Sequence, residues 1–598
     1  MITNSEKLQF ILAGVQKPAR YQGNEWNAVK KNHSGVRVKM AFAFPDLYEV
    51  GMSNQGLKIL YEAVNCHDDL LLERVFAPAP DLESKLREYR HPLFALESGS
   101  PLADFDAVGF SLQYELSYTN VLNMLDLAGI PLYSSERRET DPLVIGGGPC
   151  VFNPEPLAPF FDLFILGEAE EALPLVLHEL ADLKDKGAGR SETLMALSLL
   201  DGVYIPGHFK PYYSDEGLLQ DLEYLGPPGR ETVKKQKMES LDQAPYPTAP
   251  VVPYIQTVHD RAVVELFRGC ARGCRFCQAG YIFRPVRRRS LQKIIDLSVK
   301  LLASTGYDEI SLSSLSTSDY PHLDSLLAEL DQAMKGEQVK CSLPSLRLDS
   351  YSVDLADRLH RGRRGSLTFA PEAATERLRR VIKKNIDEND IYTALDSAVL
   401  AGWQGFKLYF MIGLPTETDE DVESILALCR KIRERYKAKV RGSFRLSVSV
   451  STFIPKANTP FQYEPQITLA EIKRRQQILI KGFRKIKGIE FSWHDAETSF
   501  LEAVFARGDR RLAPLLERAF HLGCRFDGWS DHFDFSKWEQ AFSESGIDGN
   551  FYACRSFSYE DFLPWAHLDC GIERELFVKE HRLSHAEVEV RGAADDPH

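Results

Sequence analysis

Cysteine is scarce in this sequence, and long apolar runs are missing from it. Of 598 residues only ten are cysteine, and seven of these stand alone: Cys66, Cys150, Cys341, Cys429, Cys524, Cys554 and Cys570. Isolated cysteines are typical of thiols in a reducing compartment and argue against a disulfide framework. We find neither an apolar run of about 18 residues nor a charged and apolar leader, which argues against a membrane span and an export signal. The sequence therefore predicts a cytoplasmic protein with no membrane partner.

Positive charge is in deficit over the whole chain but not in its middle. The formal net charge is −13, yet residues 261–490 hold 39 Lys and Arg against 27 Asp and Glu. A basic middle between acidic flanks indicates an anionic partner, such as a nucleic acid. Solvated helix faces such as 430–441 (RKIRERYKAKVR) are the alternative source of this charge.

Residues 1–207 have the pattern of a doubly wound domain behind an N-terminal extension. Predicted strands fall at 36–45, 105–113 and 141–149, and 161–180 repeats the order of strand, glycine and helix. Short apolar strands separated by helices predict a parallel sheet whose ligands bind at the carboxyl ends of its strands. Gly146, Gly147 and Gly167 lie at these ends, where backbone without side chains lets a flat ligand approach closely.

The remaining chain divides into three further parts. Residues 208–256 are polar and rich in proline, which predicts a linker, and residues 491–598 predict a mainly helical region over the barrel mouth. Between them, 257–490 alternates again, with predicted strands at 262–267, 308–314, 339–345, 366–370, 405–413 and 444–453. Six β/α units predict a partial barrel with its active residues at the strand carboxyl ends. The fold class is therefore α/β throughout the first two domains.

Three of the ten cysteines are crowded into one loop, "GCARGCRFCQAG" at 269–280. Cys270, Cys274 and Cys277 follow the first predicted barrel strand, and Gly269, Gly273 and Gly280 give the backbone freedom to wrap a metal centre. Structural zinc takes four protein ligands, commonly in two pairs, and no second C-x-x-C pair occurs in the sequence. Three thiolates on a four-iron cluster leave one iron open to a small molecule, which favours an iron–sulfur site.

The spacing Cys-x₃-Cys-x₂-Cys, with Phe276 before the last cysteine, resembles the radical S-adenosylmethionine (SAM) superfamily. The resemblance implies a [4Fe–4S] cluster on Cys270, Cys274 and Cys277, whose open iron chelates SAM. It also implies an electron donor such as flavodoxin or ferredoxin, and cleavage of SAM to methionine and a 5′-deoxyadenosyl radical. The cofactor carries this chemistry, while the protein positions and shields it.

The resemblance also implies which strand ends contact SAM. The candidates, besides Phe276, are hydroxyls, charges and an apolar side chain: Ser313, Ser314, Ser345, Arg347, Glu372, Lys407 and Met411. Glu372 follows the fourth strand, where a carboxylate accepts hydrogen bonds from the ribose hydroxyls. The alternatives are that the serines are turn hydroxyls, Arg347 a salt-bridge partner and Met411 core. Glu372 and Lys407 are favoured, because an isolated charge at an apolar strand end needs a partner.

The turn "DLYEVG" at 46–51 resembles the Asp-x-His-x-x-Gly turn of cobalamin-binding domains, which implies cofactor contacts at Tyr48, Gly146, Gly147 and Gly167. Tyr48 stands where the cobalt-ligating histidine is expected, and a phenol with a pKa near 10 is a poor ligand at neutral pH. Two readings stay open. Either cobalamin binds with its lower face covered by Tyr48, or the domain has lost the cofactor.

Over its whole length the chain is similar to uncharacterised radical SAM proteins with an N-terminal cobalamin-binding-like domain. Three hypotheses follow: a cobalamin-dependent methyltransferase acting on a nucleic acid or another anionic substrate; a radical SAM enzyme without cobalamin; or an iron–sulfur or RNA-binding protein without turnover. The basic stretch 361–384 motivates the third hypothesis. The substrate itself is not implied by the resemblance.

Overall fold

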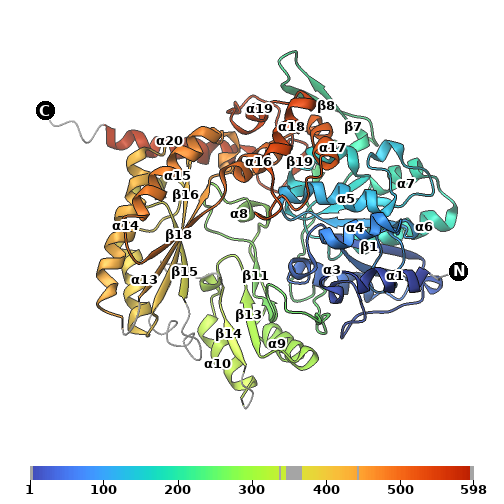
Figure 1. Cartoon of the computed structure of the whole chain (residues 1–598), viewed down its shortest axis with the longest axis horizontal. Helices are drawn as coiled ribbons and strands as arrows, with labels where there is room; N and C mark the ends of the chain where they lie inside the picture. Colours follow the sequence, from blue (N-terminus) through green and yellow to red (C-terminus); the bar gives the residue numbers. More distant parts are fainter. Residues whose placement is uncertain (1–3, 336–338, 345–365, 441–443, 593–598) are drawn as a thin grey trace.

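The N-terminal part of the chain folds around a six-stranded sheet, drawn in blue and cyan in Figure 1. The computed structural model describes residues 4–335, 339–344, 366–440 and 444–592. The sheet has the order β2-β1-β3-β4-β5-β6, and it is parallel except for β6. Its strands are β1 (Val38–Phe44), β2 (Leu70–Phe76), β3 (Ala107–Ser111), β4 (Leu143–Gly147), β5 (Leu163–Ile165) and β6 (Val203–Tyr204). The predicted doubly wound parallel sheet is confirmed.

Helices cover this sheet, and the connections that contain them diverge at one point between two neighbouring strands. They are α1 (Asn4–Ala13), α2 (Tyr48–Gly51), α3 (Gln55–Asn65), α4 (Pro80–Glu88), α5 (Tyr118–Ala128), α6 (Ala172–Lys186) and α7 (Arg190–Leu197). Because the strand order reverses between β1 and β3, the connections diverge there and leave a crevice at the carboxyl ends of these strands. This edge of the sheet is where a ligand is expected.

Strand β2 was not among the predicted strands, because Glu73 and Arg74 interrupt its apolar pattern. All seven of its residues are nevertheless buried. Arg74 Nη2 lies 2.8 Å from Glu25 Oε2, and Arg74 Nε lies 2.6 Å from Glu97 Oε1. The charge is thus tolerated in the core because it is paired on both sides.

The central domain contains two parallel sheets that together make an open barrel. One sheet holds β10 (Ala262–Glu265), β13 (Glu309–Ser313) and β14 (Lys340–Ser342), and the other β15 (Ser366–Glu372), β16 (Gly405–Ile412), β17 (Arg445–Thr452) and β18 (Ile489–Trp493). Its helices are α8 (Ala279–Ile282), α9 (Leu291–Thr305), α10 (Leu323–Ala333), α12 (Glu376–Val381), α13 (Glu388–Leu400), α14 (Asp419–Lys437) and α15 (Leu469–Phe483). The six predicted strands are all present.

Strand β18 extends the barrel past residue 490, where the sequence predicted its end. It pairs in parallel with β17, from Leu446 opposite Ile489 to Val450 opposite Trp493. None of its five residues is fully buried, so it lacks the apolar run that marks the other strands. Backbone pairing with β17 therefore defines this strand more than its own hydrophobicity does.

The segment 208–256, predicted as a linker, is structured. Strands β7 (Phe209–Tyr213) and β8 (Leu219–Tyr224) form an antiparallel hairpin, and β9 (Val233–Lys234) pairs with β19 (Leu568–Asp569) near the end of the chain. The proline and polar residues that suggested a linker lie between and beside these short strands. This segment ties the N-terminal domain to the C-terminal region.

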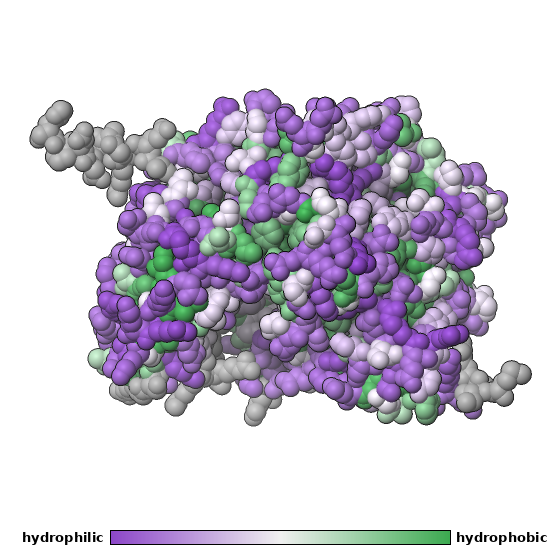
Figure 2. All heavy atoms as spheres, turned by 45° about the horizontal axis from the view of Figure 1, so that its top comes forward, coloured by the Kyte–Doolittle hydropathy of each residue, from purple (hydrophilic) through white to green (hydrophobic). Residues whose placement is uncertain are grey.

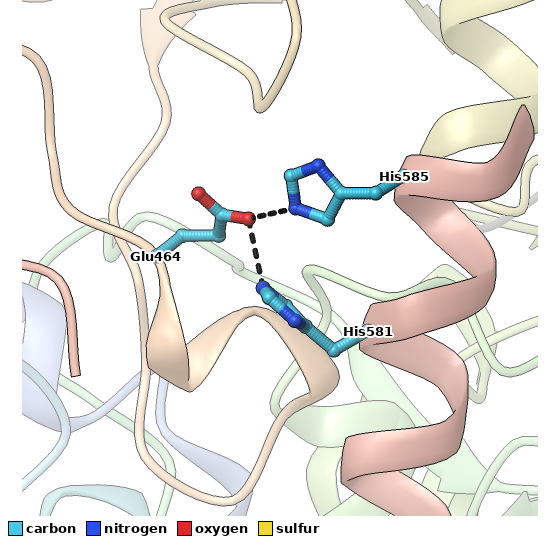
Figure 3. Close-up of side chains that lie close together, drawn as sticks. All are labelled: Glu464, His581 and His585. Carbon is cyan, nitrogen blue, oxygen red and sulfur yellow. Dashed lines mark hydrogen bonds and ion pairs between the residues drawn. The ribbon is translucent and has the colours of Figure 1, made fainter. Parts of the chain in front are cut away.

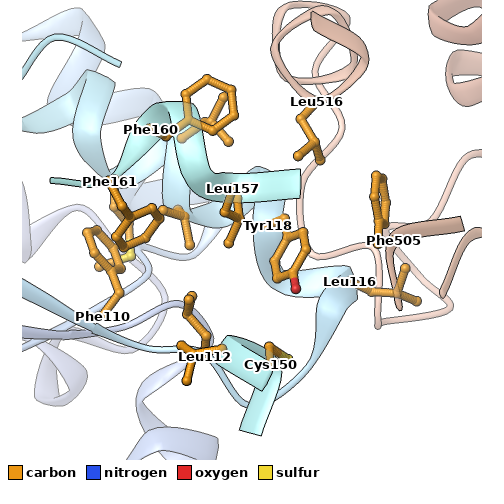
Figure 4. Packing of buried hydrophobic residues seen from close by; sticks show 14 of the residues in the cluster. Phe110, Leu112, Leu116, Tyr118, Cys150, Leu157, Phe160, Phe161, Phe505 and Leu516 are labelled. Atoms are coloured by element: carbon orange, nitrogen blue, oxygen red, sulfur yellow. The ribbon is translucent and has the colours of Figure 1, made fainter. Parts of the chain in front are cut away.

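The C-terminal region packs on both domains, and its last helix lies against the barrel helix α12. Its helices are α16 (Ala496–Ala506), α17 (Ala513–His521), α18 (Phe535–Ser545), α19 (Gly549–Ala553) and α20 (Arg574–Gly592). Helix α17 packs against α5, and one apolar core joins the two regions, as Figure 4 shows for Phe505 and Leu516 beside Tyr118 and Leu157. Asp495 caps α16 by accepting a hydrogen bond from Thr498 N at 2.9 Å.

The face drawn in Figure 2 is mostly hydrophilic, with hydrophobic residues in separate patches. Among the residues described, no helix combines the length and hydrophobicity needed to cross a bilayer.

A buried ion cluster joins the three regions of the chain. Lys456, which follows β17, lies 2.6 Å from Glu115 Oε1 of the N-terminal domain and 2.8 Å from Glu502 Oε1 of α16. Burial raises the pKa of Glu115, and the nearby Glu502 carboxylate adds to that rise, while the Lys456 ammonium opposes it. Both carboxylates therefore depend on Lys456 for compensation of their charge.

We expect Lys456→Met to lower the free energy of unfolding by about 3 kcal/mol, because it leaves one buried and one half-buried carboxylate without this cation. The matched control is Lys473→Met, whose partner Glu497 is 2.6 Å away but whose side chain is 51% exposed. The control should change stability by no more than about 1 kcal/mol. Urea unfolding followed by fluorescence measures both variants. Equal midpoints for the two variants would contradict this account of the junction.

Candidate functional site

The three clustered cysteines lie on the loop between the first barrel strand and α8. The loop leaves the short hairpin of β11 (Phe267–Arg268) and β12 (Arg287–Arg288), and all three cysteines are half-buried. Gly269 has φ +90° and Gly273 has φ +72°, so these two glycines supply the predicted backbone freedom. A Cβ at Gly269 would also lie 2.7 Å from the carbonyl oxygen of Phe283.

Gly280 differs from the other two glycines of the loop. It lies inside α8 without a positive φ, so the prediction that it gives the loop its freedom is not met. A Cβ built there would stand 3.8 Å from Cys277 Sγ. Its contribution is space beside this thiol.

Hydrogen bonds to backbone carbonyls fix the shape of the loop. Tyr281 OH donates to the carbonyl of Gly273 at 3.1 Å, and Arg284 Nε donates to the carbonyl of Cys270 at 3.3 Å. Gln278, the residue that follows Cys277, donates a hydrogen bond from Nε2 to the carbonyl of Ala457 at 3.1 Å. Hydrogen bonds within the protein therefore define the conformation of the loop.

Arg275, between the second and third cysteines, anchors the loop to the rest of the protein. It is 4% exposed, and its Nη1 donates to the carbonyl of Val381 at 2.8 Å. Its Nε lies 3.1 Å from Glu580 Oε2 on α20, and Glu580 also binds Lys383 Nζ. A buried arginine with a carboxylate and carbonyl partners holds the middle of the loop against α12 and α20.

The three thiols influence one another, which fits a shared metal centre. Burial raises the pKa of Cys277 to about 11, and the negative charges of Cys274 and Cys270 add to this rise. Thiolates gathered in this way are stabilised when a cationic centre binds them, because a metal reverses the local electrostatic balance. The donor set of three cysteines fits an iron–sulfur cluster with one iron left without a protein ligand.

Apolar side chains surround the inner edge of the loop. Phe276 packs against a small cluster that includes Met411 near the end of β16, together with Phe453 and Phe461. The structure thus brings together two of the predicted SAM-contacting residues, Phe276 and Met411, from segments far apart in sequence. Their contact with SAM stays a prediction.

Glu372 is one of several non-glycine residues of the barrel domain with a positive φ, among them Lys383, Thr416 and Asn458. It ends β15 with φ +66°, and the pairing register with β16 shifts between Phe369 and Glu372. Its carboxylate lies 3.0 Å from Lys384 Nζ. A non-glycine residue in the left-handed region costs about 1–3 kcal/mol, and such residues cluster at ligand sites. The contact of Glu372 with SAM stays a prediction.

The other predicted SAM contacts lie in different settings. Ser313 ends β13, and Ser314 Oγ is 3.0 Å from Thr317 Oγ1, a turn contact that was the alternative reading. Ser345 and Arg347 lie outside the described residues. Lys407 does not lie at a strand end.

Lys407 is the third residue of β16, which continues to Ile412. At about 3.3 Å per residue, five residues place it roughly 16 Å from the strand end. Its Nζ lies 4.8 Å from the centre of the Tyr409 ring. The strand has nearly its predicted bounds, so the Lys407 charge lies inside it and not at its carboxyl end, and the contact of Lys407 with SAM stays a prediction.

A cavity of about 260 Å³ lies where the carboxyl edge of the N-terminal sheet faces the start of the cysteine loop. The predicted glycines Gly146, Gly147 and Gly167 line it. A Cβ at Gly147 would meet no atom within 4 Å, so the backbone there borders open space. On the barrel side the wall includes Arg268 and Phe283, which flank the cysteine loop.

A charged network across this cavity was missed by the sequence analysis. Arg268 Nη2 lies 2.8 Å from Glu170 and 3.0 Å from Glu265, and Arg287 Nη2 lies 2.6 Å from Glu168. These carboxylates hold the pKa of Arg268 well above its usual value, although burial opposes them. The signal present in the sequence was acidic and basic residues just after two predicted strands, in "GEAEE" and "ELFR".

Tyr48 lies in the core of the N-terminal domain and is not among the residues that line the cavity. It is 1% exposed, its hydroxyl is 3.0 Å from Glu25 Oε1, and its ring meets Phe76 edge to face. Burial, with the neighbouring Glu25 carboxylate, raises its pKa far above the ordinary range. Tyr48 therefore packs inside the domain and does not line the cavity, where its predicted cofactor contact would require it.

Comparison with known proteins places the two halves in one superfamily. The model described as "Radical SAM proteins, N-terminal" matches residues 56–206, and the "Radical SAM superfamily" model matches residues 264–429. An uncharacterised protein of Methanocaldococcus jannaschii is 31% identical over 442 residues, covering 73% of this chain and 85% of that protein. An uncharacterised methyltransferase of Pyrococcus horikoshii is 25% identical over 48% of this chain and 58% of its own length.

Among solved structures, the radical SAM methyltransferase TsrM of Kitasatospora setae, with cobalamin and a [4Fe–4S] cluster bound, is similar with a TM-score of 0.46. The identity is 15%, and the match covers 70% of this chain and 75% of that one. At this level of similarity nothing follows about what the present chain binds. The assignment rests on the two family models and the archaeal relative, and the half-buried cysteine loop at the head of the open barrel agrees with it. The chain therefore belongs to the radical SAM superfamily, as an enzyme that uses an iron–sulfur cluster and SAM.

Proposed function

We propose that the protein is a cobalamin-dependent radical SAM methyltransferase. The observation that carries this proposal is the glycine-walled cavity between the carboxyl edge of the N-terminal sheet and the start of the cysteine loop. When bound, the cluster supplies the electron that splits SAM, and cobalamin supplies a carrier for the methyl group. Everything else in the reaction depends on how the chain positions these groups.

The position and lining of the cavity, more than its volume of about 260 Å³, favour a broad, flat cofactor. The cavity lies at the topological switch point of a doubly wound sheet, the common ligand site of this architecture. Its floor is backbone at Gly146 and Gly147, and its sides are apolar at Phe42, Ile145 and Leu173. Ser111 and Gln113, joined by a 2.8 Å hydrogen bond, give it polar groups for the amide edge of such a cofactor.

On the barrel side, the chain would hold SAM beside the cluster. Cys270, Cys274 and Cys277 would bind the cluster through the loop that Arg275 fixes in place. Glu372 offers a half-buried carboxylate at a strand end, and Phe276 with Met411 offers an apolar surface. These groups orient SAM and exclude water, so that the reactive species is formed away from solvent.

A second function is favoured by the cavity's own chemistry. None of the lining residues is a histidine, and Tyr48 faces Glu25 instead of the cavity. A radical SAM enzyme that keeps the N-terminal domain as a platform without cobalamin is therefore the competing proposal. The two differ in corrinoid binding and in the products of SAM.

The described part of the basic stretch does not favour nucleic-acid binding. Arg377 binds Asp421, Arg379 donates to the carbonyls of Ala374 and Ile386, and Lys384 pairs with Glu372. Charges that are paired within the protein are not available for phosphate contacts. The residues 361–364 lie outside the described chain. The proposal therefore leaves the substrate class undefined.

The test of the proposed function is anaerobic reconstitution with iron, sulfide and a corrinoid, followed by product analysis. We expect bound corrinoid, 5′-deoxyadenosine and S-adenosylhomocysteine from one sample, and loss of both products in Cys274→Ala. The control Cys66→Ala alters an exposed thiol and should keep them. Deoxyadenosine without corrinoid uptake would instead establish the cobalamin-independent enzyme.

Corrinoid binding should depend on the open backbone at Gly147. Gly147→Leu should lower the corrinoid retained after gel filtration at least tenfold, because its side chain would fill space that is now open beside the backbone. Gly207→Leu is the matched control, since a Cβ there also meets no atom within 4 Å and lies outside the cavity lining. Equal retention in both variants would remove the cavity from the proposal.

Glu372 should contribute to SAM binding through its charge. Glu372→Gln should raise the dissociation constant of SAM about tenfold, since a hydrogen bond to a charged group is worth about 1.5–3 kcal/mol. Glu376→Gln, four residues away with its side chain 53% exposed, is the control. Equilibrium dialysis on the cluster-loaded protein measures both constants. An unchanged dissociation constant for Glu372→Gln would show that this carboxylate pairs with Lys384 and does not contribute to SAM binding.

A further inference from the structure

Two histidines of α20 and a glutamate converge away from the cysteine loop, where α20 packs against a neighbouring segment. His581 and His585 are one helical turn apart, so their side chains lie on the same face of the helix. Glu464 follows the short helix η11 (Pro460–Tyr463), against which α20 packs. Figure 3 shows both imidazole rings directed at one carboxylate oxygen.

The distances are those of a ligand set gathered around a single point. His581 Nε2 is 2.8 Å and His585 Nε2 is 2.6 Å from the same Glu464 Oε1 atom. The three ligand atoms all lie within 4.8 Å of one another. Tetrahedral zinc holds nitrogen and oxygen ligands at about 2.0–2.2 Å, which separates them by about 3.3 Å. Small rotations of the side chains are enough to reach that geometry.

The ring of His581 is also held from its far side. Its Nδ1 lies 2.7 Å from Tyr559 OH, and the rings of Tyr463 and Tyr559 meet it edge to face at 5.5 and 5.6 Å. Histidines that bind metals typically engage their second nitrogen in a hydrogen bond, which fixes the orientation of the ring. A helix face that served only as surface would not require this support.

We propose that Glu464, His581 and His585 form a binding site for a divalent transition-metal ion, with Zn²⁺ as the expected occupant. Two imidazoles and a carboxylate are a common protein ligand set for zinc. Because the His585 side chain is 48% exposed, at least one coordination position faces solvent. The site is independent of the proposed methyl transfer.

The position of this site gives the metal a structural consequence. Glu580, the residue before His581, binds Arg275 of the cysteine loop and Lys383 after α12. A metal ion that joins α20 to Glu464 therefore fastens the helix that holds the cysteine loop. Loss of the ion should loosen the connection between α20 and the barrel without removing any ligand of the cluster.

The experiment uses the full-length protein with its iron–sulfur cluster assembled, so that the cysteines are already occupied. Zn²⁺ is titrated against a chromophoric chelator under anaerobic conditions, and metal content is measured after dialysis. We expect one zinc per chain, bound at least 100-fold more weakly in His585→Ala and in Glu464→Gln. Tyr559→Phe should weaken binding about 10–100-fold, as expected for a group that orients a ligand.

The matched control is His521→Ala, which changes another exposed histidine beside a glutamate, with His521 Nε2 3.8 Å from Glu517 Oε1. It should bind zinc as the wild type does. X-ray absorption at the zinc edge should show nitrogen and oxygen neighbours at about 2.0–2.1 Å and no sulfur at about 2.3 Å.

Three outcomes would overturn the proposal. The first is the absence of stoichiometric zinc in the cluster-loaded wild type. The second is zinc with sulfur neighbours, which would place the ion at the cysteines. The third is equal affinity in His585→Ala and the wild type. His585 is half-exposed, and unchanged iron content with an unchanged circular dichroism spectrum verifies that this variant is folded.

Discussion

A loop that carries three thiols must be rigid while one side of it stays open, and this constraint organises the protein around it. The rigidity comes from groups outside the ligands. Arg275 is buried against the carbonyl of Val381 and the carboxylate of Glu580, and Tyr281 binds the carbonyl of Gly273. A four-iron cluster on three cysteines leaves one iron for an exogenous ligand. The loop is thus preorganised by neighbours that belong to α8, α12 and α20.

The N-terminal domain presents its ligand edge to that same loop. The reversal of strand order between β1 and β3 opens a crevice, and glycines at the ends of β4 and after β5 keep it clear of side chains. Arg268, which directly precedes the loop, binds Glu170 from the opposite wall. The cavity and the cysteine loop are therefore coupled through one arginine, which is the physical basis for proposing a shared reaction centre. The C-terminal helices and Lys456 keep the two domains in this arrangement.

Much of this architecture could be predicted from local sequence patterns. The predicted barrel strands were apolar runs between helices, and the cysteine spacing with its glycines identified the loop. Strand β2 was missed because its buried Arg74 is neutralised by Glu25 and Glu97, and both of these residues lie far from Arg74 in the sequence. The Arg268 network was missed for the same reason, since Glu170 lies about a hundred residues earlier in the chain.

Residue roles were harder to predict than the fold. Lys407 lies inside β16 although the strand bounds were predicted nearly correctly, and the Tyr48 hydroxyl binds Glu25 instead of facing the cavity. Glu464 lies more than a hundred residues from His581, so its meeting with the two histidines could not be read from spacing. Where a role depends on a partner far along the chain, a single sequence does not contain the pairing.

The most direct test of the central claim is iron and sulfide analysis with Mössbauer spectroscopy of oxygen-free protein, before and after addition of SAM. The account predicts about four iron and four sulfide per chain, and a changed signal from a single iron when SAM binds. A zinc ion held by Cys270, Cys274, Cys277 and a fourth protein ligand, or a cluster whose spectrum SAM leaves unaltered, would contradict it.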